Sequence, residues 1–402
     1  MATTYAGRTA SQPKKKSVGR GRRLIETEMD GVLLGTVIAL LVIGLLMMFS
    51  ASYPAAIADG ESGTYYAVRQ VIFAAAGLGA MFFLSVLNYH FFEKLWVSGP
   101  ASVVGILMLI LVLIPGIGKT VNGATRWIQI GGDSRGITFQ PSELMKIAIV
   151  LLFATLIVRN EKRMDNFWWG VVPYILMLGA VAGLMMKEPH LSGTLIIAVL
   201  AMTLIFVGGA KPLHCVIIAA VGIAALGVVV LYLMYSEGIG YFEDRILSWR
   251  DPFNPEYMQD ETWQTCQSLI AIGSGGMFGL GLGASRQKFQ YLPEAQNDFV
   301  FAVLCEEFGF VGAVTVILLF CLLVFRGFYI ASKAKDKFGM LVAVGLTMHI
   351  GLQALLNIAV VSNAIPNTGI SLPFFSYGGT ALMMQLAEMG ILLNISRHAK
   401  LE

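Results

Sequence analysis

The residues with the strongest chemical signal lie in the stretch 264–309, which leads from a polar, glycine-rich segment into a long apolar run. The stretch passes Glu294 and reaches Asp298 where the apolar run begins, and the run itself still carries Glu306 and Glu307. Acidic residues in a segment that is otherwise buried in a membrane are costly and therefore indicate a function. A carboxylate at the border between water and lipid could meet a lipid-borne substrate, which makes Asp298 a candidate catalytic residue.

Asp298 also has a purely structural interpretation. Asp is a favoured helix N-cap, and either Asn297 or Asp298 could cap the helix that follows. A capping box requires Glu or Gln three residues later, and residue 301 is Phe. At about 1.5 Å per residue, Glu306 and Glu307 lie roughly 12–14 Å deeper on different faces of the helix. We expect at least one of them to make hydrogen bonds in helix packing.

A second candidate pair, Glu143 and Lys146, stands at the start of another apolar run. Residues three apart share one face of a helix, so the two could form a self-neutralising ion pair, with Glu favoured in the first turn by the helix dipole. A cation is disfavoured near a helix start, however. A pocket that needs a positive charge for a phosphate explains Lys146 better.

Arg126 and His190 lie in two short polar segments between apolar runs. Arg126 precedes Trp127, so it is either a residue of the membrane interface or a bidentate fork for a pyrophosphate. His190 lies between Pro189 and Gly193, a pattern that predicts a tight turn, and alone it is a weak functional signal. The glycines from 273 to 283 lack the context of a phosphate-binding loop.

Composition places these residues in a membrane protein. The chain has 402 residues, of which 56% are hydrophobic and 13% charged, and its mean hydropathy is +0.72. A soluble domain has about 25% charged residues, so we predict an all-α, polytopic integral membrane protein. Apolar runs of about 20 residues, the length that crosses a bilayer, predict ten spans. They are 31–52, 69–87, 97–115, 142–159, 168–187, 192–209, 213–235, 298–326, 338–361 and 379–396.

The distribution of Lys and Arg predicts the orientation of these spans. With ten spans both termini share one side, and 18 of the 28 Lys and Arg fall on that side, which the positive-inside rule makes the cytoplasm. Residues 1–28 are polar and basic, and we interpret them as a disordered cytoplasmic tail that anchors topology or binds a partner. Residues 29–402 then form one membrane domain, with long extracellular loops at 116–141 and 236–297. We expect short amphipathic or re-entrant segments in these loops.

The four cysteines, at 215, 266, 305 and 321, show no CxxC spacing. They support neither a disulfide framework nor a zinc site.

Several motifs resemble the SEDS family (FtsW, RodA and SpoVE), the membrane peptidoglycan polymerases of bacteria. The matching stretches are GATRWI, QPSELMK, EPHLSGT, the block from QSLIAIGSGG to CEEFG, and PNTGISLPFFSYGGT. They spread over nearly the whole chain after the tail, and the wording around 251–298 is closer to the FtsW/SpoVE branch than to RodA. One departure is EPHLSGT, where many members have a PDxGT-like sequence, so His190 stands at an acidic position. The resemblance therefore carries over no acidic residue at this position.

The resemblance implies ten membrane helices in the bacterial cytoplasmic membrane and polymerisation of lipid II. It implies that Asp298 is the catalytic aspartate, that Glu143 and Lys146 are the family's functional pair, and that Arg126 is its loop arginine. Within the matching motifs we also assign substrate binding to polar residues at the following positions: Gln264, Gln267, Ser268, Glu294 and Ser376. The implied partners are a class B penicillin-binding protein, which is a transpeptidase, and other division or elongation proteins, with no nucleic acid.

The residue types suit this chemistry. A carboxylate can take the proton of an attacking sugar hydroxyl, a contribution of roughly 10²–10⁴-fold. Lys146 and Arg126, together with a divalent cation such as Mg²⁺ or Mn²⁺, can stabilise a departing pyrophosphate. The alternatives are a lipid II flippase, an elongation polymerase of the RodA type, or a scaffold without activity. A flippase would place its binding residues near the bilayer midplane between internal repeats, and here the unusual charges crowd the outer rim.

Overall fold

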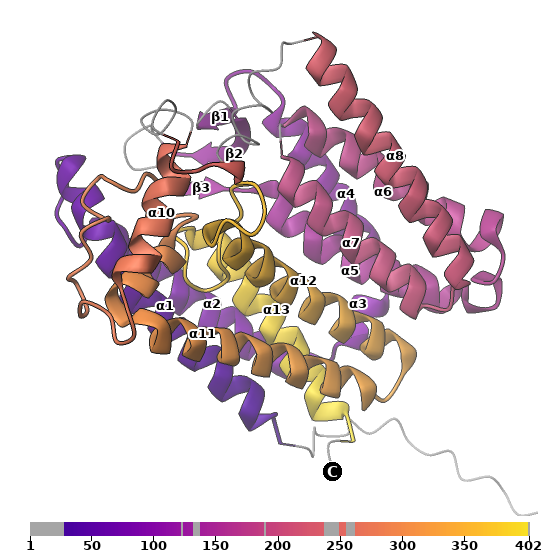
Figure 1. The fold of residues 1–402 in the computed structure, drawn as a ribbon. Coiled ribbons are helices and arrows are strands. Elements are labelled where there is room, and N and C mark those ends of the chain that lie inside the picture. The colour runs from indigo at the N-terminus through magenta and orange to yellow at the C-terminus, as the bar shows by residue number, and fades with distance from the viewer. Residues whose placement is uncertain are drawn as a thin grey trace, which may run out of the picture.

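The computed structural model describes residues 28–121, 124–131, 137–188, 190–236, 249–254 and 262–400. These residues are mostly helical, and long helices run side by side through the molecule (Figure 1). The helices near the N-terminus are α1 (Gly31–Ala58), α2 (Tyr65–Val86), α3 (His90–Glu93), α4 (Leu95–Val112), α5 (Pro141–Arg159), α6 (Val172–Lys187), α7 (Leu191–Val207) and α8 (Pro212–Ser236). Those nearer the C-terminus are α10 (Trp263–Ser274), α11 (Val300–Ser332), α12 (Lys337–Val361) and α13 (Gly379–His398).

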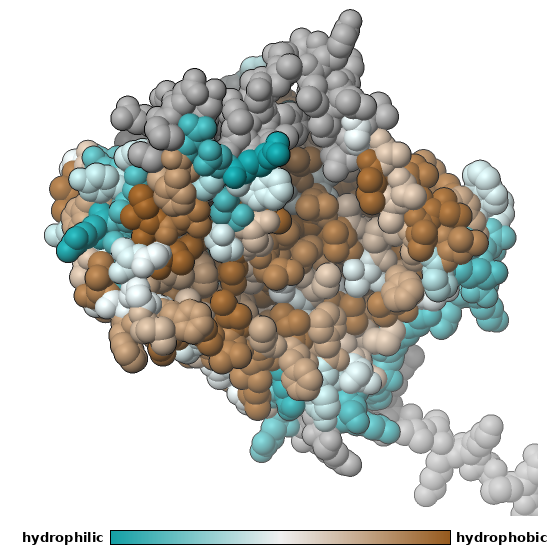
Figure 2. Space-filling model, in the orientation of Figure 1, coloured by the Kyte–Doolittle hydropathy of each residue, from teal (hydrophilic) through white to brown (hydrophobic). Residues whose placement is uncertain are grey.

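Seven of these helices are long and apolar enough to cross a membrane. They are α1, α2, α4, α5, α6 with the short π-helix Phe167–Val171 before it, α11 and α12. The helix α7 is apolar but shorter, as is the stretch 212–224 of α8. Each predicted span overlaps one helix, and the protein is a multi-pass, helical membrane protein. The surface agrees, because a broad apolar band crosses its middle between hydrophilic ends (Figure 2).

The expectation of an all-α chain is wrong in one loop. Residues 118–139 form a three-stranded antiparallel sheet of β1 (Gly118–Val121), β2 (Ala124–Ile130) and β3 (Ile137–Phe139), with β2 in the middle. Ala124 and Ile128 of β2 are buried, and the pairing of β2 with β1 is interrupted by a β-bulge, in which Arg126 is the extra residue. A β-bulge re-aims a side chain, and Arg126 Nε donates to the backbone oxygen of Glu188, in the turn between α6 and α7, at 3.3 Å.

The second long loop, 236–297, contains the short helix α10, as expected of a short segment in this region. The segment 275–299 that follows α10 is fastened to α11 by its backbone. Leu280 N donates to Glu306 O at 2.9 Å, and Phe310 N donates to Gly276 O at 2.9 Å. Close approach requires Gly309, which kinks α11 with φ of +65° and where a Cβ would lie 2.3 Å from Gly279 N.

Glu306 and Glu307 complete this attachment, and Glu307 also accepts from Ser50 Oγ of α1 at 2.6 Å, which confirms the expected hydrogen bond in helix packing. Glu306 accepts from the backbone N–H groups of Arg286 and Gln287, at 3.0 and 3.3 Å. Glu307 forms an ion pair with Lys288 at 2.8 Å, and all three side chains, Glu306, Glu307 and Lys288, are buried. The acids in the apolar run therefore hold the segment that leads to Asp298.

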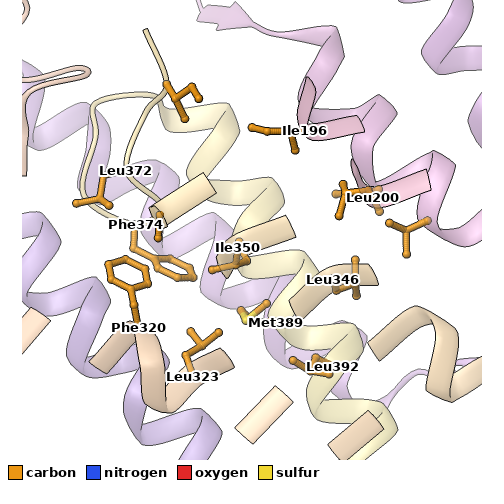
Figure 3. Close-up of a cluster of buried hydrophobic side chains, with 14 of the residues drawn as sticks. Ile196, Leu200, Phe320, Leu323, Leu346, Ile350, Leu372, Phe374, Met389 and Leu392 are labelled. Atoms are coloured by element: carbon orange, nitrogen blue, oxygen red, sulfur yellow. The ribbon is translucent and has the colours of Figure 1, made fainter. Parts of the chain in front are cut away.

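The core lies where α5, α7, α11, α12 and α13 meet. Figure 3 shows Ile196 and Leu200 of α7, Leu346 and Ile350 of α12, and Met389 of α13 among its side chains. The most apolar window of α5 is 78% buried and that of α12 is 67% buried, against 22% for α2. Side chains on α5 and α12 are therefore held by a closely packed centre.

Both ends of the described chain lie at one end of the helix bundle. Asp30, the N-cap of α1, accepts from Arg326 at 2.7 Å, and its N–H donates to Ser396 of α13 at 3.3 Å. The sheet and α10 lie at the opposite end (Figure 1). The predicted tail, residues 1–28, falls outside the described residues except for its last residue.

Candidate active site

Asp298 stands two residues before the first residue of α11, and it does not cap that helix. The N-cap position belongs to Phe299, and no side chain makes a capping hydrogen bond there. Asp298 is partly buried, and its carboxylate faces Gly369, a residue with φ of +63°. A Cβ added to Gly369 would lie 3.3 Å from Asp298 Oδ2. Its carbonyl oxygen accepts from Asn357 Nδ2 at 2.7 Å. The capping interpretation is therefore wrong, and the carboxylate is left for another role.

The surroundings of Asp298 tune its acidity. Burial raises the pKa of this carboxyl, the nearby charge of Glu294 raises it further, and Arg126 lowers it, with a result of about 6. An ordinary Asp has a pKa near 3.9. A pKa close to physiological pH suits a group that must accept a proton and release it again.

Arg126 connects Asp298 with the turn between α6 and α7. Its Nε donates to the backbone oxygen of Glu188 at 3.3 Å, and its charge acts on the carboxyl groups of both Glu188 and Asp298. Glu188 is fully buried, and burial raises the pKa of its carboxyl to about 8, against the opposing effect of Arg126. Neither carboxyl oxygen has a hydrogen-bond partner among the described residues. A carboxyl with this pKa is mostly protonated at pH 7.

His190 follows in the same turn and is almost fully buried. Burial lowers the pKa of its imidazole to about 3, and the charges of Arg126 and Lys146 lower it further. Its Nε2 lies 3.3 Å from Gln140 Nε2, which makes Nε2 the acceptor of a neutral ring. The residue at the family's acidic position is thus an uncharged imidazole beside two cations.

Glu143 and Lys146 form the predicted ion pair in the first turns of α5, with Lys146 Nζ 2.7 Å from Glu143 Oε1. Both side chains are buried, with 6% and 2% of their surface exposed. Lys146 Nζ also lies 3.4 Å from Gln353 Oε1 of α12. Glu143 Oε2 has no hydrogen-bond partner within the described part of the chain. The pair is real, and its cation lies among the buried polar groups around His190.

The other candidate residues divide into two groups. Glu294 acts on Asp298 directly, as its charge raises the pKa of that carboxyl, and its φ of +53° is strained for a residue with a side chain. Gln264, Gln267 and Ser268 lie on α10, where Gln267 is buried and Ser268 Oγ donates to Val361 O at 2.8 Å. Gln264 accepts from Asn367 Nδ2 at 2.8 Å, which ties α10 to the loop after α12.

Ser376 organises the loop before α13. Its Oγ accepts from Leu372 N at 2.7 Å, and its carbonyl oxygen accepts from Gln70 Nε2 of α2 at 3.1 Å. The side chain therefore supports the loop that carries Gly369 and Ser371.

Sequence reasoning missed two residues of α12, Gln353 and Asn357. Asn357 holds the backbone oxygen of Asp298, and Gln353 lies beside Lys146. A signal was present, because His349, Gln353 and Asn357 interrupt an apolar helix at intervals of four residues. The fold and the site together define a helical membrane protein with a tuned carboxylate and two cations, Arg126 and Lys146, at the end of the bundle that carries the sheet.

The chain belongs to the FtsW/RodA/SpoVE family, whose sequence profile is described as "Cell cycle protein" and matches residues 31–401. It is 39% identical over 375 residues to stage V sporulation protein E of Bacillus subtilis (strain 168), which covers 93% of this chain and 99% of the relative. It is 38% identical over 377 residues to the probable peptidoglycan glycosyltransferase FtsW of Trichlorobacter lovleyi, with 93% and 94% covered. The resemblance to the FtsW/SpoVE branch is confirmed.

Two solved structures share the fold. One is a chain from a peptidoglycan synthase complex that coordinates polymerization and crosslinking, with a TM-score of 0.72, 27% identity, and 93% of this chain and 99% of that chain covered. The other is the rod shape determining protein RodA of Thermus thermophilus, with a TM-score of 0.64, 26% identity, and 93% and 98% covered.

Proposed function

We propose that this protein is a peptidoglycan glycosyltransferase that polymerises lipid II into glycan strands. In the reaction a sugar 4-hydroxyl attacks the anomeric carbon of a growing glycan, a new C–O bond forms, and the bond to the lipid pyrophosphate breaks. Asp298 accepts the proton of the hydroxyl, and the electron pair of the broken bond leaves with the pyrophosphate. The names of the relatives, which include probable peptidoglycan glycosyltransferases, support this reaction.

One observation carries the proposal: the half-buried Asp298, with a pKa raised to about 6, lies within the electrostatic reach of Arg126. A base with this pKa is mostly ionised at pH 7, and its proton affinity is higher than that of a solvent-exposed Asp. Arg126 and Lys146 supply positive charge for the negative charge that develops on the leaving pyrophosphate. Because Glu188 and His190 are uncharged, the turn between α6 and α7 adds no negative charge that would offset Arg126 and Lys146.

A divalent cation would bind at this site only together with the phosphates of the substrate. The described residues hold no group of three His, Cys, Asp or Glu side chains placed to bind a metal ion. Mg²⁺ is commonly bound through one or two carboxylates together with substrate phosphates. We propose that the pyrophosphate of the substrate would itself hold the Mg²⁺ or Mn²⁺, which would stabilise the leaving group, while Asp298 stays free of the metal and acts as the base.

The proposed topology has ten spans, with both termini in the cytoplasm and the site at the outer face of the bacterial cytoplasmic membrane. Basic residues support it, since Arg159, Lys162, Lys335 and Arg397 all occur in segments that the topology places inside. The proposed partner is a class B penicillin-binding protein, since one structural neighbour comes from a complex that polymerises and crosslinks. Relatives named FtsW and stage V sporulation protein E favour a role in division or sporulation over elongation.

The decisive experiment gives purified full-length protein labelled lipid II in detergent, with its partner transpeptidase present, and separates the products by size. A polymerase makes glycan chains where no sealed membrane exists. A flippase or an inactive scaffold leaves lipid II unchanged in detergent, and this outcome would overturn the proposal. Movement of labelled lipid II across sealed vesicles, without glycan formation, would identify the flippase.

A further inference from the structure

The helix α12 carries buried polar side chains on one face of an otherwise apolar span. His349, Gln353 and Asn357 are spaced four residues apart, so they lie above one another along the helix. Their exposed fractions are 1%, 1% and 0%. A polar side chain buried in a membrane domain is costly unless it makes hydrogen bonds, so the partners of these residues indicate what the face is for.

Asn357 binds the segments on either side of the catalytic carboxylate. Its Nδ2 donates to Asp298 O at 2.7 Å and to Ile370 O at 2.6 Å. Ile370 follows Gly369, whose missing side chain makes room for Asp298 Oδ2. A single amide group therefore fixes the backbone that carries the carboxylate and the backbone against which the carboxylate rests.

Gln353, one turn earlier on α12, contacts both Lys146 and Ser371. Its Oε1 lies 3.4 Å from Lys146 Nζ, and its Nε2 donates to both the carbonyl oxygen and the hydroxyl of Ser371, each at 3.1 Å. Lys146 is also held by Glu143 at 2.7 Å. Gln353 thus connects the ammonium group of Lys146 to Ser371, the neighbour of Ile370, which Asn357 binds.

We propose that Gln353 and Asn357, which stand about one turn apart on α12, are positioning residues that set the place of Lys146 relative to the backbone of Asp298. This inference rests on the proposed function, because it gives the two contacts a purpose in catalysis. The base must reach the attacking hydroxyl while the cation reaches the pyrophosphate on the other side of the anomeric carbon. Lys146 and Asp298 come from segments about 150 residues apart in the sequence, and adjacent turns of one helix set their separation. An error of about 1 Å in such an arrangement can cost about 10²-fold in rate.

The third polar residue of the face provides an internal comparison. His349 pairs with Glu388 of α13, with Nδ1 2.8 Å from Oε2, and both side chains are buried. This contact joins two helices in the bundle and reaches none of the candidate site residues. A variant of this pair perturbs the same helix at similar burial without touching Asp298 or Lys146.

The test compares kcat and KM for lipid II in the full-length protein with its partner. Asn357→Leu removes both hydrogen bonds to the segments around Asp298, and we expect kcat to fall about 10²-fold while KM stays within about threefold. Gln353→Met removes the contact with Lys146, and we expect kcat to fall about tenfold with a smaller change in KM, because that ammonium group acts on the charge that develops on the leaving pyrophosphate. The control, His349→Leu with Glu388→Leu, is expected to change the melting temperature and leave kcat and KM of the folded protein within about twofold.

Asn357→Ser keeps one donor and serves if Asn357→Leu does not fold. We expect an intermediate kcat and an acid limb of the pH–rate profile displaced from that of the unchanged protein, because the surroundings of the Asp298 carboxyl have shifted. Unchanged kcat, KM and acid limb in Asn357→Ser would overturn the positioning role, as would equal losses in the control pair. If these variants are normal while Asp298→Asn is inactive, the positioning inference fails alone. If Asp298→Asn is fully active, the proposed base fails.

Discussion

At the scale of single residues, burial and two neighbouring charges compete to set the pKa of Asp298. Burial and Glu294 favour the protonated carboxyl, and Arg126 favours the carboxylate. The balance leaves a group that is ionised at neutral pH and still basic enough to take a proton from a hydroxyl. The effect of Glu294 explains why an acid four residues before the proposed catalytic carboxylate is useful at this site.

The pH dependence of polymerisation tests this balance. The carboxylate form of Asp298 is the proposed base, so we expect the rate to rise with pH through about 6 and to level off above it. Glu294→Gln removes a charge that raises the pKa, so the acid limb should move to lower pH. Arg126→Gln removes a charge that lowers the pKa, so the limb should move to higher pH, with a lower plateau. Shifts in the opposite directions would contradict these assignments.

Lys146 allows stability and catalysis to be separated. Lys146→Ala leaves Glu143 as an uncompensated buried acid, and breaking a buried pair in this way costs about 3–5 kcal/mol. Glu143→Gln with Lys146→Met removes both charges, so most of the stability should return. We expect this double variant to fold and to lose about 10²-fold in kcat/KM, whereas Lys146→Arg should retain more activity than Lys146→Ala. If the double variant polymerises normally, the pair is only structural.

Sequence reasoning was strongest where a charge conflicts with its surroundings. Asp298, Lys146 and Glu143 stand out because they enter apolar runs, and the structure places all three at one end of the bundle. Gln353 and Asn357 escaped notice because an uncharged amide in an apolar helix is a weaker conflict. Their roles depend on which segment lies opposite them, and that is a property of the packing. Glu188 also required the structure, because only its burial makes its carboxyl unusual.

At the scale of elements, the segment 275–299 is an irregular chain fixed by side chains of α11. Lys288 Nζ donates to Glu307 at 2.8 Å, to Gly283 O at 2.8 Å and to Ser50 of α1 at 2.8 Å. The ion pair thus connects α1, α11 and the segment that ends at Asp298. The role of the Lys288–Glu307 ion pair is therefore to fix the position of this segment.

Variants of this ion pair should behave differently when made singly and together. Glu307→Ala leaves Lys288 buried without its charge partner, and we expect a loss of about 3–5 kcal/mol of stability with activity lost in parallel. Lys288→Met with Glu307→Leu removes both charges and should recover most of the melting temperature. Thermal unfolding in detergent measures this difference. Equal destabilisation by the single and double variants would show that the charges do not interact.

The three-stranded sheet is the element that the sequence did not predict. Membrane helices are visible as long apolar runs, so every predicted span coincides with a helix. The strands β1–β3 are three to seven residues long and lie between two spans, where hydropathy carries little information. The pairing of three short strands depends on contacts between segments, which the sequence does not state. This sheet is what turns Arg126 towards the site.

At the scale of the whole molecule, the two ends of the helix bundle carry different parts of the chain. The ends of the described chain meet at one of them, through Asp30, Arg326 and Ser396. The sheet, α10 and the candidate site lie at the other (Figure 1). This separation fits a protein that works on a substrate at the outer face of the membrane.

Cysteine labelling in intact cells tests the orientation. A cysteine introduced at Gly60, in the turn between α1 and α2, should react with an impermeant thiol reagent from outside. Lys162→Cys and Lys335→Cys should react only after the membrane is made permeable. Each variant is made in a background in which the native Cys321, which is exposed, is replaced. Labelling of Lys162→Cys or Lys335→Cys in intact cells would contradict the proposed topology.

Asp298→Asn is the most direct test of the central claim, that this carboxylate is the base of a glycan polymerase. Asn matches Asp in size and keeps the backbone carbonyl that Asn357 binds, and it cannot accept the proton of a hydroxyl. The measurement is glycan formation from lipid II by purified Asp298→Asn, with its melting temperature and its binding of the transpeptidase recorded alongside. We predict a folded protein that binds its partner and forms no glycan chains. Substantial glycan product from well-folded Asp298→Asn would contradict the assignment of this residue as the general base.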